Sequence, residues 1–279
     1  MNKLRMIAVN DIDSAALSVI DGVELATLPV TNLAEYDNSN TFRSESIADV
    51  AIKGVFDTFK LVTGCVLWRH NLSNTAKLRL ELFDDEAQQS RVYDSGLIEA
   101  TPTKSLQDWQ WQVEPIVASV FDGWQTRYSQ LWLDAQSFAL SFKLTIQDPD
   151  NADGFIDVTR LYMGRHFEPD YNFSYGHSLG LSSNVEQFRT DDGSLLSPDK
   201  PLWRKASFAL NYIQDADRAH LSNALRYVNT SKDCFISMFP GLNDQKELEY
   251  AFACKFTHIP TIQSITYNLY RSEFAIEEC

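Results

Sequence analysis

An acidic stretch between two apolar segments holds the clearest candidate cation ligands. Hard cations such as Ca²⁺ need several oxygen ligands at fixed intervals. The stretch contains Asp148, Asp150, Asn151, Asp153, Gly154 and Asp157. An EF-hand loop that began at Asp148 would need Gly at its sixth position and Glu at its twelfth, but Gly154 is the seventh residue and Thr159 the twelfth. The spacing therefore excludes an EF-hand. It favours a solvated turn between two strands and leaves a looser calcium-binding loop as the alternative.

The histidines show no spacing typical of a metal or catalytic site. The five are His70, His166, His177, His220 and His258. The sequence has no H-E-x-x-H, G-x-S-x-G or glycine-rich phosphate loop. We expect His70, which follows an apolar segment, to be a hydrogen-bonded turn residue rather than a base. A Ser-His-Asp set assembled in three dimensions stays open, but we name no catalytic, cofactor-binding or metal-binding residue and expect the chain not to be an enzyme.

The cysteines are too far apart for a clustered zinc site. They are Cys65, Cys234, Cys254 and Cys279, with no C-x-x-C pair among them. We expect buried free thiols in a chain made in a reducing cytoplasm.

Aromatic residues gather in two places. Trp109, Trp111, Trp124, Tyr128 and Trp132 fall in one short span, and Tyr171, Phe173 and Tyr175 alternate further on. Aromatic rings fill cores, anchor subunit interfaces and stack on sugar rings. We expect most of these rings to lie in the core. A subunit interface is the second interpretation and a sugar platform the third.

Strands must position these side chains, because alternation of apolar and polar residues dominates the sequence. Segments 77–83, 138–146, 248–256 and 265–269 alternate, with Phe274 and Ile276 following. Val66-Leu67-Trp68 is continuously apolar and indicates a strand buried on both faces. These patterns are typical of antiparallel sheets. We expect His258-Ile-Pro260 to form the turn between the last two long strands.

One helix is expected, over 215–229. Leu221, Leu225 and Val228 lie three and four residues apart and would form one apolar face. Residues 165–206 are rich in Pro, Gly, Ser, Asn and Asp, which indicates a long connection between two β-rich regions. We therefore expect an N-terminal arm or edge segment over 1–27, a first domain over 28–170, and a smaller domain over 171–279 whose helix packs on its sheet.

Composition excludes several classes of protein. The chain has 279 residues, 44% apolar and 22% charged, which is ordinary globular usage. With 24 Lys and Arg against 38 Asp and Glu, the net charge is −14, which argues against direct nucleic-acid binding. No stretch approaches the roughly 20 apolar residues of a membrane span, and polar residues interrupt any N-terminal signal segment.

Three segments taken together carry a family resemblance. Leu28-Pro-Val-Thr-Asn-Leu33, followed by Thr41-Phe42-Arg43-Ser44, is similar to "P-x-x-N-L…W-R-S". Val66-Leu67-Trp68-Arg69-His70-Asn71-Leu72-Ser73 is similar to "G-H-N-L-S" and its surroundings. Asp153-Gly154-Phe155-Ile156-Asp157-Val158-Thr159-Arg160-Leu161 is similar to "D-G-Y-h-x-h-G-R-L", where h is apolar. In this order the segments resemble the minor tail proteins of tailed bacteriophages and prophages.

The resemblance implies a galactose-binding-like jelly roll in the first domain and a structural role in the virion. We therefore expect a mainly β protein, with an antiparallel jelly-roll-like sandwich followed by a smaller β-rich domain. We expect a subunit of the distal tail tip or baseplate that acts in virion assembly and host attachment. Its expected partners are other tail proteins and copies of itself.

Two other functions stay open. One is a carbohydrate-binding module that contacts host-surface glycans, and the other is a tail-associated cell-wall hydrolase. A glycosidase would need two facing carboxylates roughly 5–9.5 Å apart, and the sequence does not single out two among its 38 acids.

Overall fold

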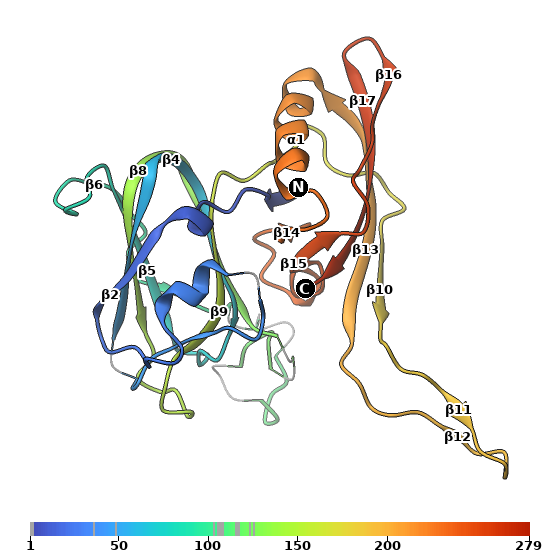
Figure 1. Cartoon of the computed structure of the whole chain (residues 1–279), viewed down its shortest axis with the longest axis horizontal. Coiled ribbons are helices and arrows are strands. Elements are labelled where there is room, and N and C mark those ends of the chain that lie inside the picture. The colour runs from blue at the N-terminus through green and yellow to red at the C-terminus, as the bar shows by residue number, and fades with distance from the viewer. Residues whose placement is uncertain are drawn as a thin grey trace. The chain divides into compact units, whose positions relative to one another are not determined.

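Antiparallel strands form most of the regular secondary structure of this protein in the computed structural model (Figure 1). The structure describes residues 3–35, 37–47, 49–102, 104, 109–114, 118–122, 124 and 126–279. The chain folds into two compact units. The first combines residues 1–168 with 234–252, and the second combines 169–233 with 253–279.

The first unit contains ten strands and three short helices among its described residues. The strands are β1 (Arg5–Ile7), β2 (Ala16–Asp21), β3 (Phe42–Arg43), β4 (Val50–His70), β5 (Lys77–Phe83), β6 (Arg91–Asp94), β7 (Ile98–Glu99), β8 (Tyr128–Gln147), β9 (Asp157–Gly164) and β14 (Cys234–Ser237). The helices are η1 (Asp11–Ser14), η2 (Val30–Ala34) and α2 (Gln245–Glu249).

The long strands β4 and β8 form a ribbon that takes part in both layers of a sandwich. Val50–Val55 pairs with residues 146–141 of β8, and this half is flanked by β2 and β5. After a register shift, residues 60–68 pair with 139–128, and β9 and then β3 continue that layer. Apolar side chains from both halves, such as Ile52, Leu80 and Leu161, share one core. This arrangement confirms a mainly β, antiparallel sandwich.

The second half of β4 is buried on both faces, as Val66-Leu67-Trp68 predicts. Leu67 points into the core between the layers, whereas Trp68 points outward against residues 234–252. The ring of Phe235, in β14, contacts the rings of Trp68, Tyr128, Trp132 and Tyr162, with centroid distances of 5.8–6.5 Å. These contacts explain why residues 234–252 fold with the first unit.

The second unit is a sheet with one helix. Its elements are β10 (Ser178–Ser182), β11 (Phe188–Arg189), β12 (Leu195–Leu196), β13 (Trp203–Gln214), α1 (Asp215–Val228), β15 (Ala251–Phe256), β16 (Ile262–Thr266) and β17 (Leu269–Glu278). Strand β13 lies between β10 and β17, and β17 also pairs with β15 and β16. Helix α1 contacts β13 and β17, and Leu221, Leu225 and Val228 are buried. The expected helix and its packing on the sheet are confirmed.

Three local expectations were wrong. Leu248 lies in helix α2, because the side chain of Asp244 caps it by accepting a hydrogen bond from Glu247 N at 2.9 Å. The segment 265–269 is not one strand: it ends β16, turns at Tyr267 and Asn268, where Asn268 adopts a φ of 58°, and begins β17. Phe138 is 63% exposed because the register shift in the β4–β8 ribbon reverses which residues face the core.

The chain is also divided differently from the expected domains. Residues 234–252, expected in the C-terminal domain, lie in the first unit. The segment expected as an N-terminal arm or edge segment holds β1, which pairs with β14, and β2, which pairs with β4.

Candidate functional site

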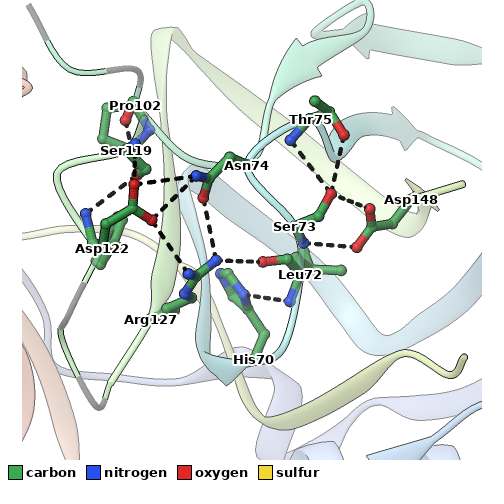
Figure 2. Close-up of polar contacts among 11 residues, drawn as sticks. His70, Leu72, Ser73, Asn74, Thr75, Pro102, Ser119, Asp122, Arg127 and Asp148 are labelled. Carbon is green, nitrogen blue, oxygen red and sulfur yellow. Dashed lines mark hydrogen bonds and ion pairs between the residues drawn. The ribbon is translucent and has the colours of Figure 1, made fainter. Parts of the chain in front are cut away.

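One end of the sandwich is organised around Arg127 (Figure 2). Its Nη1 donates to the Leu72 carbonyl at 3.0 Å and to Asn74 Oδ1 at 3.2 Å. Its Nη2 lies 3.6 Å from Asp122 Oδ1, which also accepts from Asn74 Nδ2 at 3.2 Å. Asp122 Oδ2 accepts from Ser119 N at 2.9 Å. The 71–75 turn and the 119–122 loop are thereby joined through one guanidinium and one carboxylate.

The acidic stretch forms the turn between β8 and β9 and faces the same 71–75 segment. Asp148 is fully buried and accepts hydrogen bonds from the backbone N and hydroxyl of Ser73 and from Asn151 Nδ2. Asp150 accepts from Thr75 Oγ1 at 2.8 Å. Protein donors thus occupy these carboxylates. Within the described residues, no three or more His, Cys, Asp or Glu side chains are grouped as metal ligands.

His70 lies in this network as a neutral structural residue. Its Nδ1 accepts a hydrogen bond from Leu72 N at 3.2 Å, so the proton is on Nε2, which donates to Ser129 Oγ at 2.8 Å. This polarity prevents His70 from taking a proton from Ser129. Burial, with a smaller contribution from the charge of Arg127, lowers the pKa of His70 to about 3. The pair therefore lacks the chemistry of a nucleophile and its base.

His166 and the cysteines also have structural environments. His166 hydrogen-bonds Thr63 Oγ1 at 2.7 Å, and burial lowers the pKa of His166. All four cysteines are free, and three are buried. Burial raises the pKa of Cys65 to about 12, which leaves its thiol protonated and unreactive.

The aromatic cluster expected over 109–132 divides into core and surface residues. Tyr128 is buried and Trp132 packs on Phe235. Trp109 and Trp111 instead form an edge-to-face pair with centroids 5.4 Å apart, and the side chain of Trp111 is 72% exposed. In the second unit, Tyr171 and Tyr175 are exposed as well.

Glu114 holds the loop that carries the tryptophan pair. Its carboxylate accepts from Lys104 Nζ at 2.7 Å and from Gln110 N at 3.0 Å. Its backbone carbonyl accepts from Trp109 Nε1 at 3.2 Å. The loop thus fixes Trp109 and presents Trp111 to solvent.

A cavity of about 230 Å³ lies in the first unit. It is lined by segments 99–102 and 120–121, by Tyr128 and Gln130, and by residues 243, 244, 247 and 248. Sequence reasoning missed it, because Glu247 lies more than a hundred residues after Gln130 and neither residue belongs to a motif identified from the sequence. The short Asp-capped helix α2 was the one available signal.

No protein-family model matches the chain, and no curated protein does. Among solved structures, the chain is similar to the family 32 carbohydrate-binding module of C. perfringens NanJ in complex with galactose. The identity is 10% over 58% of this chain and 99% of that one, with a TM-score of 0.38. It is also similar to chitosan-binding module 1 of a chitosanase/glucanase from Paenibacillus sp. IK-5 (7% identity, 56% and 99% coverage, TM-score 0.39).

A third similar structure is the lectin domain of lectinolysin complexed with Lewis B antigen (10% identity, 56% and 96% coverage, TM-score 0.37). The likeness in all three cases is weak, and none of the three is a bacteriophage tail protein. In the part of the chain that the structure describes, no helix is long and apolar enough to cross a membrane.

Proposed function

We propose that this protein is a non-catalytic glycan-binding protein whose first unit contacts sugar rings through Trp111. The observation that carries this proposal is the exposed indole of Trp111, braced edge-to-face by Trp109 on a loop that Glu114 holds in place. A large aromatic face fixed before binding offers apolar area to the C–H face of a sugar at little entropic cost. The neutral, inert environment of His70 supports binding rather than catalysis.

A glycan array, followed by titration calorimetry on the best ligand, tests this function. We expect Trp111→Ala to weaken binding at least tenfold and Trp111→Phe to weaken it less, because an aromatic face is kept. Tyr267→Ala is the matched control, since Tyr267 is 89% exposed but lies in the second unit. The proposal fails if no glycan binds, or if Trp111→Ala binds as tightly as the wild type.

We propose a second function, as a structural subunit of a bacteriophage tail, because the second unit carries an exposed arm with apolar side chains that could contact another protein. The arm is residues 183–202, whose strands β11 and β12 extend away from the sheet of that unit (Figure 1). Every residue from Asp191 to Leu202 is exposed. Phe188, Leu195, Leu196 and Leu202 are each at least 46% exposed. An isolated two-stranded ribbon is marginally stable in water, so contact with another tail protein or another copy of this chain would stabilise it.

On this proposal the protein is made in the cytoplasm of a bacterial host and resides in the virion tail at the distal tip or baseplate. Cryo-electron microscopy and mass spectrometry of purified virions test it directly. We expect the protein in particles in several symmetric copies, and we expect Phe188→Ser with Leu196→Ser to reduce incorporation without unfolding the chain. Presence in lysates with absence from particles would refute the tail function.

No observation within the described residues favours the cell-wall hydrolase, since the buried carboxylates Asp148 and Glu247 are held by protein donors. Clearing of purified peptidoglycan by the protein would restore that alternative.

A further inference from the structure

The cavity of the first unit carries a fixed negative charge. Of the residues that the structure describes, three carboxylate residues line it, Glu99, Asp244 and Glu247, and no Lys, Arg or His does. Glu247 is 3% exposed and makes no ion pair with the described residues. Its carboxylate accepts from Gly241 N and Asn243 N, each at 2.7 Å, and from the side chain of Gln130. Neutral donors therefore orient this carboxylate without cancelling its charge.

A second feature of the cavity is an unused hydroxyl. Thr101 lines the cavity and is 1% exposed. Its Oγ1 has no hydrogen-bond partner among the described residues. Buried hydroxyls in folded proteins are normally hydrogen-bonded, and one left without a partner loses free energy that a ligand's N–H group would recover.

Two aromatic rings provide the apolar wall of the cavity. Phe121 and Tyr128 pack edge-to-face with centroids 5.0 Å apart, and both are buried. Aromatic faces attract cations as well as hydrocarbon. The volume of about 230 Å³ is below the roughly 300–1,000 Å³ of sites for drug-sized ligands, so the occupant is small.

From these features we propose that the cavity binds the primary ammonium group of a small organic amine no larger than a hexosamine. Glu99 and Glu247 supply the charge that selects the cation. The Thr101 hydroxyl is buried beside the cavity, so on this proposal a rotation about its Cα–Cβ bond brings Oγ1 to one ammonium N–H, from which it accepts a hydrogen bond. The rings of Phe121 and Tyr128 contact the carbon skeleton. An anion is repelled by the three carboxylates, and a neutral hexose leaves their charge uncompensated. This site is separate in composition from the Trp109–Trp111 pair and does not depend on glycan binding there.

Calorimetric titration of the full chain at pH 6.5 with glucosamine, glucose, N-acetylglucosamine and cyclohexylamine tests the proposal. We expect glucosamine and cyclohexylamine to bind, more weakly as salt is raised, and the two neutral sugars not to bind. If glucosamine alone binds, the source of the ammonium is a sugar; if both amines bind, the site recognises organic ammonium in general. Either result supports the site. Equal binding of glucose and glucosamine, or binding of Ca²⁺ in place of both amines, would overturn it.

Two substitutions locate the binding. Glu99→Gln removes an exposed charge and should weaken glucosamine binding about two- to fivefold. Thr101→Val keeps the shape of the side chain and should weaken binding about tenfold while leaving thermal stability unchanged or raised, because no existing hydrogen bond is lost. Glu186→Gln, in the second unit, is the charge-matched control and should bind as the wild type does. Wild-type affinity in both Glu99→Gln and Thr101→Val would place the ligand elsewhere and refute the assignment.

Discussion

His70 couples the stability of the first unit to pH through one buried imidazole. The pKa is about 3 in the folded chain against 6.5 for an ordinary histidine. Between these values the unfolded chain binds a proton that the folded chain does not, so stability is lost as pH falls below 6.5. We expect protonation of this residue in the unfolded chain to lower the free energy of unfolding of the wild type by about 2 kcal/mol between pH 7 and pH 5. Urea unfolding of wild type and His70→Gln at both pH values measures the difference.

Asp11 has the opposite effect on the pH dependence of stability, so its contribution must be separated from that of His70. Burial raises its pKa from 3.8 to about 6, although Lys60 Nζ lies 3.7 Å from its Oδ1 and lowers it. The folded state therefore holds the extra proton, and stability from this residue is lost as pH rises from about 4 to about 6. The two effects partly cancel in the wild type. The informative quantity is therefore how the free energy of unfolding changes with pH in wild type compared with His70→Gln. The same change in both proteins would contradict the prediction.

At the scale of single residues, the sequence identified the type of environment but not the partners. His70 was expected to be a hydrogen-bonded turn residue; it is hydrogen-bonded, but it is the last residue of β4, and its partner Ser129 lies 59 residues away on β8. No sequence motif singles out Glu247, whose side chain is identified by its tertiary contact with Gln130. Such pairings depend on strand register, which local patterns do not encode.

Among the elements, the β4–β8 ribbon depends on a close approach at Gly54. This residue pairs with Phe142, and a Cβ at position 54 would lie 2.1 Å from Phe142 Cε1. We expect Gly54→Ala to lower the free energy of unfolding by about 1–3 kcal/mol through overpacking, and Phe142→Leu in the same chain to recover part of the loss. Denaturant titration measures both.

Gly180→Ala in β10 is the matched control, because a Cβ at position 180 would have no neighbour within 4 Å and the backbone there is not left-handed. We expect its stability to match or exceed that of the wild type. If Gly54→Ala were as stable as Gly180→Ala, the ring of Phe142 would not be fixed against β4.

Helix α1 packs on the sheet of the second unit through one apolar face. Leu225 is 6% exposed, and α1 lies against β13 and β17. We expect Leu225→Asp to unfold the second unit or cost more than about 3 kcal/mol, because an unpaired carboxylate would be buried. Ala219→Asp, on the exposed face of the same helix, should change little. Circular dichroism and limited proteolysis of the full chain compare the two, and equal protease resistance would rule out this packing.

Alternation predicted strand positions well where a strand is straight and paired along its length, as in β5 and the second half of β8. It failed where a bulge, a turn or a cap interrupted the period. Phe138 follows the register shift of the ribbon, Asn268 forms a turn, and Leu248 lies in a helix begun by Asp244. In each case a local irregularity, namely a register shift, a turn residue or a helix cap, outweighed a pattern that extended across it.

For the whole molecule, the main departure from expectation is that the first unit is discontinuous in sequence. Composition located a connection near residue 170, but composition does not show that the chain returns at residue 234. The return depends on the ring of Phe235, whose partners come from β4, β8 and β9. Because these contacts are between aromatic rings far apart in the chain, periodicity within segments does not reveal them.

We expect Phe235→Ala to destabilise the first unit by about 3–5 kcal/mol, since a fully buried ring is replaced by a cavity. Phe188→Ala, in the exposed arm, is the control and should be close to neutral. Thermal unfolding monitored by tryptophan fluorescence reports the change, because Trp68 and Trp132 contact Phe235 directly. If Phe235→Ala lowered the stability no more than Phe188→Ala does, residues 234–252 would not be needed to complete the core of this unit.

The place of Phe235 has a consequence for the order in which the protein folds during synthesis. A ribosome releases the first 168 residues, then the whole 169–233 segment, before β14 can reach the outer face of β4. Until then Trp68, Tyr128 and Tyr162 have no Phe235 to contact, and the nascent sandwich exposes an apolar aromatic surface. The cell must therefore protect this surface from aggregation while about 65 residues are added, and a slowed ribosome within 169–233 would lengthen the period of greatest risk.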